Sequence, residues 1–166
     1  MSAEVALELL SGCALHRVTA RDSDELLTKM AAAVVENGHG RPSLIDAVRA
    51  REQKFPTGLP TPVPSAIPHT DPVHVLHAGL AVATLAKPVV FAQMGGAGEQ
   101  LAVEIVVLLC ITEPGDQVGA LQEVLARLGD GAAVAAVTRH DDPATFEVAV
   151  RSWLEVGRPV SSSAAS

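Results

Sequence analysis

The sequence predicts a single three-layer α/β sandwich, in which helices cover both faces of a mixed, mostly parallel sheet. The main observation is the run 101–111, which is apolar at nearly every position and rich in valine and isoleucine. Strands that are apolar on both sides are typical of sheets covered by helices on both faces. Helical and strand patterns also alternate along the chain, and 166 residues with 48% hydrophobic content suit one domain with a substantial core.

Two helices are expected in the first third of the chain. Over residues 22–37 apolar side chains recur with helical spacing, Asp22 can cap the first turn with Glu25 as capping-box partner, and Gly38 ends the pattern. The apolar stripe consists of Leu26, Leu27, Met30, Ala33 and Val34. A second helix is expected from Pro42 to about residue 53, since proline suits a first helical position.

Residues 55–72 form a fixed-shape loop. They contain six prolines, which exclude a helix or a central strand over most of the segment. Each proline locks its own φ and restricts the residue before it, so the loop is expected to hold one conformation.

Strands and helices alternate through the rest of the chain. The expected strands are 79–85, 88–91 and 101–111, with a glycine-rich turn at 94–98, and the expected helices are 116–128, 132–138 and 143–156. The side chains expected to face inward from the first of these helices are Val118, Leu121, Val124, Leu125 and Leu128. The domain is expected to span residues 1–156, and the polar tail 157–166 to be disordered.

Charge and composition exclude several classes of function. The net charge of −7 argues against a nucleic-acid partner, because phosphate backbones require clustered lysine and arginine. The longest apolar run is too short to span a bilayer, and the first residues lack the basic region of a secretory signal, which predicts a cytoplasmic protein. Cys13 and Cys110 have no metal-ligand spacing, and Cys110 is expected to be a small buried side chain.

Four short motifs occur in order: Arg51-Glu52, then FPTGL at 55–59, AIPHTD at 66–71 and LAKPVVF at 85–91. The set resembles the fructose/mannitol-type enzyme IIA family of the bacterial sugar phosphotransferase system, whose pattern is RE, TG, a proline–histidine element and L-x-x-P-V-x-F. The His-Thr-Asp form is most similar to the galactitol-type branch. The resemblance covers about residues 5–155.

The resemblance implies a phosphotransferase that uses a phosphohistidine and needs no cofactor or metal. By matching position, His69 would accept a phosphoryl group from phospho-HPr and pass it to a cysteine of the IIB component. IIB would then phosphorylate a sugar, such as galactitol, that enters through the membrane component IIC. The chemistry requires an imidazole nitrogen with a free lone pair, while a hydrogen bond fixes the other ring nitrogen.

Four further residues are expected at the site. The transferred group carries about −2 charge, and Arg51, Thr57 and Thr70 are candidate donors to it. Thr57 and Thr70 could equally serve only to order the loop. Gln117 occupies the position where many mannitol- and fructose-type members carry a second active-site histidine. The galactitol-like branch also has glutamine there. A neutral amide could donate to phosphate or simply begin a helix.

Two alternative functions remain open at this point. A nitrogen-type regulatory enzyme IIA would share the fold and signal by phosphorylation-dependent protein binding. His69, Asp71, His74 and His77 could instead form the metal site of a hydrolase. Zinc requires convergent ligands. A short helix starting at Pro72 would place His74 and His77 on one face, away from His69, so solvated histidines are the favoured interpretation.

Overall fold

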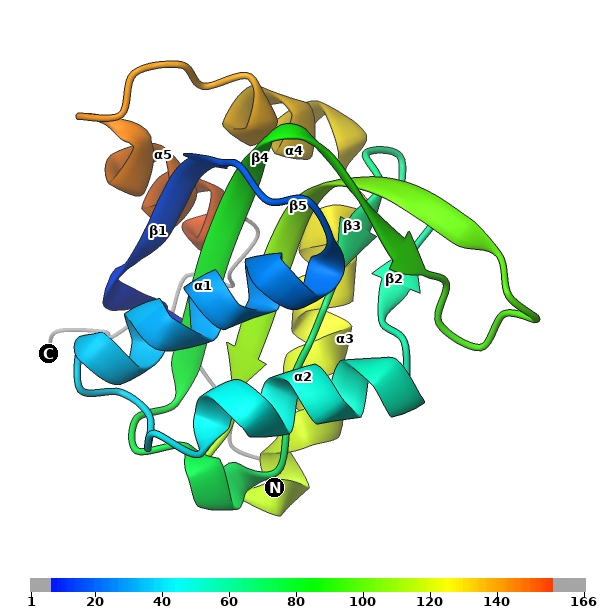
Figure 1. Cartoon of the computed structure of the whole chain (residues 1–166). Helices are drawn as coiled ribbons and strands as arrows, with labels where there is room; N and C mark the ends of the chain where they lie inside the picture. The colour runs from blue at the N-terminus through cyan, green and yellow to red at the C-terminus, as the bar shows by residue number, and fades with distance from the viewer. Residues whose placement is uncertain (1–6, 157–166) are drawn as a thin grey trace, which may run out of the picture.

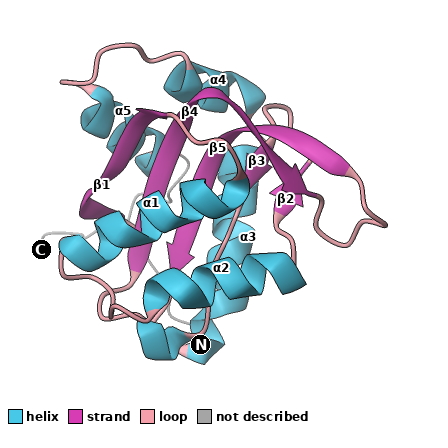
Figure 2. Ribbon diagram, viewed as in Figure 1, coloured by secondary structure: helices cyan, strands magenta, loops and turns pink. Residues whose placement is uncertain are grey.

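The computed structural model describes residues 7–156, which form one five-stranded sheet between two layers of helices (Figures 1 and 2). The strand order is β1-β4-β5-β3-β2. The strands are β1 (Leu9–Val18), β2 (Gly58–Leu59), β3 (Ser65–Ala66), β4 (Gly79–Ala92) and β5 (Gln100–Cys110). The pairs β1–β4 and β3–β5 are parallel, whereas β4–β5 and β2–β3 are antiparallel.

Helices cover both faces of the sheet. One layer contains α1 (Ser23–Glu36) and α2 (Leu44–Lys54), which cross in front of the sheet in Figure 1. The other layer contains α3 (Gln117–Leu128), α4 (Gly131–Thr138) and α5 (Phe146–Glu155). Two short 3₁₀ turns, η1 (Pro72–His74) and η2 (Pro114–Asp116), precede β4 and α3.

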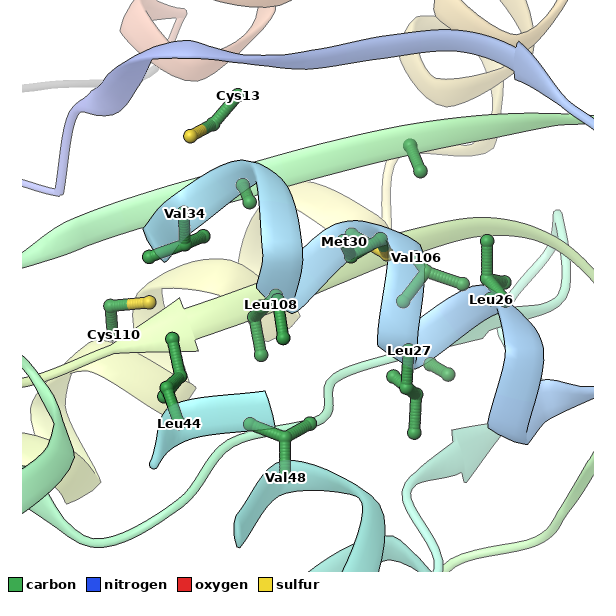
Figure 3. Close-up of a cluster of buried hydrophobic side chains, with 14 of the residues drawn as sticks. Cys13, Leu26, Leu27, Met30, Val34, Leu44, Val48, Val106, Leu108 and Cys110 are labelled. Carbon is green, nitrogen blue, oxygen red and sulfur yellow. The ribbon is translucent and has the colours of Figure 1, made fainter. Parts of the chain in front are cut away.

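The core is divided by the sheet into two apolar clusters. Along β5, Val106 and Leu108 point toward α1 and α2, whereas Ile105 and Val107 belong to the cluster under α3, α4 and α5. This alternation follows from the two-residue period of a strand. Figure 3 shows the first cluster, where side chains of α1 and α2 pack onto β5.

The α/β class and the helices on both faces are confirmed, although parallel pairs make up only half of the strand pairs. The α1 helix begins after Asp22, which accepts a hydrogen bond from the Glu25 amide at 2.8 Å. Gly38 follows it with φ of +80°. The expected strand 101–111 and the helix at 132–138 are found within one residue of their bounds. The expected tail 157–166 lies outside the described residues.

Several details differ from expectation. The helices expected from Pro42 and from residue 143 begin at Leu44 and Phe146, and the short strands β2 and β3 lie inside the expected loop 55–72. The strand β1 was not expected, and the strands expected at 79–85 and 88–91 are one strand, β4, with a register irregularity between Thr84 and Val89. Val118 and Leu125 are exposed, because α3 buries only the narrow stripe of Ala120, Val124 and Leu128, spaced four residues apart.

Within the 7–156 range no helix is long and apolar enough to cross a membrane.

Candidate functional site

The loop that carries His69 runs along the end of β5. After β3, the Pro68 carbonyl accepts a hydrogen bond from the Leu109 amide at 2.9 Å, and His69 forms a parallel bridge with Leu109. Pro68 has a fixed φ and therefore stiffens the backbone before the histidine. The loop is therefore anchored to the central sheet at the position of the histidine, which holds the backbone of His69 in one place.

His69 is held in a single tautomer. Its Nδ1 lies 2.9 Å from the Ile67 carbonyl oxygen, and only 8% of the residue is exposed. A carbonyl oxygen can only accept, so in the neutral ring Nδ1 carries the hydrogen and donates it. The lone pair consequently resides on Nε2, which makes Nε2 the nucleophilic atom of this ring.

The surroundings of His69 keep the ring neutral. Burial is the largest cause that lowers the pKa of His69, and the positive charge of Arg51 lowers the pKa further. The hydrogen bond to Ile67 and the charge of Asp71 act in the opposite direction and only partly offset these effects. Because the pKa falls below the ordinary value for histidine, the unprotonated ring predominates at neutral pH and its lone pair is available.

Arg51 supplies positive charge beside the histidine from the last turn of α2. Its Nη1 lies 3.8 Å from the Asp71 carboxylate, and its guanidinium carbon lies 5.4 Å from the centre of the Phe55 ring. Its Nε is buried and has no hydrogen-bond partner within residues 7–156. A guanidinium with a long ion pair and an unused donor is well suited to bind an anion that arrives at the site.

Thr57 is hydrogen-bonded to Glu52, the residue that follows Arg51. The Glu52 carboxylate accepts hydrogen bonds from the Thr57 amide at 2.9 Å and from its hydroxyl at 2.8 Å. Burial raises the pKa of Glu52, and the two bonds from Thr57 oppose that rise. The hydroxyl of Thr57 thus already donates to a buried acid, and the pair fastens the start of the 55–72 loop to α2.

Replacement of Thr57 by Val should destabilise the protein by about 1–3 kcal/mol at neutral pH, because the buried carboxylate of Glu52 loses a donor. The loss should shrink at mildly acidic pH, where the raised pKa of Glu52 lets the carboxyl take up a proton. Urea unfolding of wild type and variant at neutral and at mildly acidic pH measures this loss of unfolding free energy. Thr70→Val is the matched control for stability, since the Thr70 hydroxyl makes no hydrogen bond within residues 7–156. Unchanged stability with slower phosphoryl transfer would instead favour a contact of Thr57 with phosphate.

Thr70 and Gln117 lie at the same end of the sheet. Thr70 follows His69 directly and is 8% exposed. Gln117 is the first residue of α3, a short distance along the chain from the end of β5 at Cys110, and it is partly exposed. Its side chain makes no hydrogen bond to any of the residues 7–156 that the structure describes. Neither side chain has a hydrogen-bond partner within the described residues.

The histidines after His69 do not converge with it. His74 ends η1 and its Nδ1 lies 2.8 Å from the Ser43 hydroxyl, whereas His77 lies beyond η1 and contacts His39. The expected turn at Pro72 is present, but it is too short to place His74 and His77 on one helical face. In the part of the chain that is described, no three side chains of the metal-ligating types gather.

Three contributors to the site were not expected from the sequence. They are the Ile67 carbonyl that fixes the histidine, the Asp71 carboxylate near Arg51, and the Glu52 carboxylate that holds Thr57. Glu52 and Asp71 belong to the motifs at 51–52 and 66–71, and this membership was the signal that could have identified them as site residues. Their partners, however, follow only from the folded loop.

The fold therefore places a buried histidine with a free Nε2 lone pair beside the end of a central strand. The chain belongs to the family described as "Phosphoenolpyruvate-dependent sugar phosphotransferase system, EIIA 2", which matches residues 11–150. Membership carries a role as phosphocarrier, with transfer through a histidine. No curated protein matches the sequence significantly.

Solved structures of related domains share the fold. IIA mannitol of Escherichia coli is 18% identical with a TM-score of 0.73, over 89% of this chain and 99% of that one. The same enzyme in complex with phosphorylated IIB of Escherichia coli is 17% identical with a TM-score of 0.70, over 89% of this chain and 97% of that one. The nitrogen regulatory protein IIA-Ntr of Neisseria meningitidis is 17% identical with a TM-score of 0.66, over 88% of this chain and 95% of that one.

Proposed function

We propose that this protein accepts a phosphoryl group from phospho-HPr on Nε2 of His69 and passes it to a cysteine of a IIB component. IIB then phosphorylates a sugar of the galactitol type as it enters through IIC. The observation that carries the proposal is the hydrogen bond from Nδ1 of His69 to the Ile67 carbonyl, which leaves Nε2 as the only ring nitrogen with a free lone pair.

The reaction needs no proton transfer at His69. The Nε2 lone pair attacks the phosphorus atom of the donor phosphohistidine, the nitrogen–phosphorus bond in the donor breaks, and a new bond forms to Nε2. Nδ1 keeps its hydrogen throughout, so the phosphorylated ring carries a positive charge that weakens the new bond. A thiolate of IIB then attacks the phosphorus, and the imidazole leaves as the neutral ring.

Catalysis rests on position and charge. Phosphoryl transfer proceeds through a loose transition state in which charge is spread over the three equatorial oxygens. Arg51 is the positive side chain beside His69, and its partly exposed guanidinium, held by a 3.8 Å ion pair to Asp71, can turn its N–H groups toward those oxygens. Thr70 can add a neutral donor, and Thr57 acts by fastening the loop through Glu52.

Apolar side chains stand next to the site residues in a manner that suits contact with protein partners. Phe55, Val73 and Val118 are 53%, 69% and 66% exposed, and each lies within four residues of Arg51, Asp71 or Gln117. Exposed apolar groups beside a reactive centre are typical of protein-binding surfaces. The Escherichia coli IIA mannitol structure in complex with phosphorylated IIB provides the precedent for such a partner.

The function is tested by incubating the protein with phosphoenolpyruvate, enzyme I and HPr, and then adding the IIB protein encoded nearest to its gene. Mass spectrometry should show one phosphoryl group gained, stable to base and labile to acid, and then its transfer to the IIB cysteine. Phosphorylation without onward transfer to any IIB would favour the nitrogen-type regulatory role, for which the likeness to IIA-Ntr is the specific observation. Absence of phosphorylation would contradict both.

Gln117 is proposed to face the phosphate as a neutral donor. Gln117→Leu should then slow transfer, because an apolar group is placed against a charge. Gln117→His should be tolerated and should lengthen the life of the phosphohistidine below a pH of about 6.5, where an unperturbed imidazole is protonated. Phosphorus NMR over a pH series measures this, with the exposed Gln122→Leu in the same helix as control. Identical lifetimes and rates in all variants would reduce Gln117 to the start of α3.

A further inference from the structure

Two histidines far apart in the sequence meet edge to face beside the end of α1, with an angle of 68° between the ring planes. Nδ1 of His39 is 3.1 Å from Nδ1 of His77, and the ring centroids are 5.3 Å apart. His39 follows α1, and His77 lies between η1 and β4. Figure 1 shows these two stretches side by side at the lower left, the first in cyan and the second in green. Neither histidine takes part in the proposed phosphoryl transfer.

The backbone on both sides of the pair is fixed. The amides of Gly38 and His39 donate to the carbonyls of Val35 and Val34, which is the Schellman arrangement that closes a helix. The His39 carbonyl in turn accepts hydrogen bonds from the amides of Leu76 at 2.8 Å and His77 at 3.1 Å. These backbone hydrogen bonds therefore fix the positions from which the two rings project toward each other.

His39 is oriented as metal-binding histidines are. Its Nε2 lies 3.1 Å from both the carbonyl and the hydroxyl oxygen of Ser11. A hydroxyl can donate or accept but a carbonyl can only accept, so in the neutral ring Nε2 carries the hydrogen and Nδ1 carries the lone pair. Donation of the second ring nitrogen to a backbone carbonyl is the usual support of a histidine that ligates a metal. This lone pair points at His77, whose Nδ1 donates to it in the absence of an ion.

We propose that His39 and His77 form a binding site for a late first-row divalent metal ion, of which Zn²⁺ is the probe of choice, with both Nδ1 atoms as ligands. Two bonds of about 2.0–2.1 Å to one ion span the observed separation at an angle of roughly 100°, between tetrahedral and square-planar values. The Nδ1 hydrogen of His77 exchanges through water to its exposed Nε2, so the ring stays neutral as it binds.

The site is open. In residues 7–156 no third histidine, cysteine or carboxylate joins the pair, so water occupies the remaining positions on the ion. Such an ion would tie the end of α1 to the segment that leads from the phosphoacceptor loop to β4. Two protein ligands make a site that loads and unloads reversibly, in contrast to a closed structural zinc site.

The test is titration of the full-length protein with Zn²⁺, followed by ¹H–¹⁵N NMR of the imidazole nitrogens and by calorimetry. One ion per chain should bind, with the largest shifts at the Nδ1 resonances of His39 and His77. His39→Gln and His77→Gln should each weaken binding at least about tenfold, the lower bound found when even a supporting partner of a ligand is removed. His74→Gln and His69→Gln should bind Zn²⁺ as wild type does.

Absence of saturable binding at millimolar Zn²⁺ overturns the site, as does a wild-type affinity for Zn²⁺ in both His39→Gln and His77→Gln. Shifts centred on His69 or His74 also overturn it, because they place the ion elsewhere. The wild-type spectra decide the question by themselves if a variant is poorly folded. These outcomes are independent of phosphoryl transfer, which is assayed without added zinc.

Discussion

Replacement of His69 by Ala is expected to abolish phosphorylation of the protein completely. The ring supplies the attacking lone pair at Nε2, and no side chain beside it can replace that atom: Thr70 is a hydroxyl without a base, and Arg51 is permanently charged. In the assay with phosphoenolpyruvate, enzyme I and HPr, wild type should gain one acid-labile phosphoryl group and the variant none.

The control for this variant is His74→Ala, which removes the nearest histidine along the chain and its contact with Ser43. It should be phosphorylated at the wild-type rate. Amide spectra of both variants establish that each is folded. Label on His74, His77 or any residue other than His69 in the wild-type protein would contradict the assignment of the phosphoacceptor.

Local sequence patterns predicted the parts of the fold in which a single period persists. The helix α1 combines an apolar stripe, a capping aspartate and a terminal glycine, and β5 is apolar on both faces, so both could be located from the sequence. The strand β1 could not be located. Gly12 has φ of +75° and the register with β4 shifts between Leu9 and Ala14, which breaks the alternation that marks a strand.

Proline misled the prediction for β4 for a related reason. The prediction ended one strand at Leu85 and began the next at Pro88, a position that suits the first residue of a strand. The strand instead continues, because Pro88 lies within the register irregularity between Thr84 and Val89, where no pairing with β5 is found. On α3, the sequence offered more apolar residues than the helix buries. Val118 sits about 200° around the helix from Ala120, and only the sheet determines which stripe is covered.

The resemblance provided candidate residues for the site, but not how they are arranged. His69 was the prediction on which the proposed function rests, and the structure adds the Ile67 carbonyl that selects its tautomer. Contacts such as Arg51–Asp71 and His39–His77 join residues 20 and 38 positions apart and leave no periodic signal. They follow from the path of the loops, which local patterns do not encode.

Replacement of Arg51 by Ala is expected to slow phosphoryl transfer by about ten- to more than a hundredfold, the effect of losing a charge-assisted hydrogen bond of roughly 1.5–3 kcal/mol. Arg51→Lys should recover only part of the rate, since an ammonium keeps the charge but loses the planar set of donors. Lys54→Ala is the matched control, because it removes another cation of the same helix that also stands over Phe55. An unchanged rate in Arg51→Ala would make the arginine a structural residue.

The same variant has a second, independent readout. The charge of Arg51 is one of the causes that lower the pKa of His69, after burial, so its removal should raise the pKa of His69 toward the ordinary value. Loss of the ion pair acts in the same direction, because it leaves the Asp71 carboxylate free to favour the imidazolium. An NMR titration of the His69 ring should therefore show protonation at higher pH in Arg51→Ala than in wild type or Lys54→Ala. A slower variant whose His69 titrates as in wild type would show that Arg51 acts on the phosphate alone; an equal pKa together with an equal rate would remove Arg51 from the site altogether.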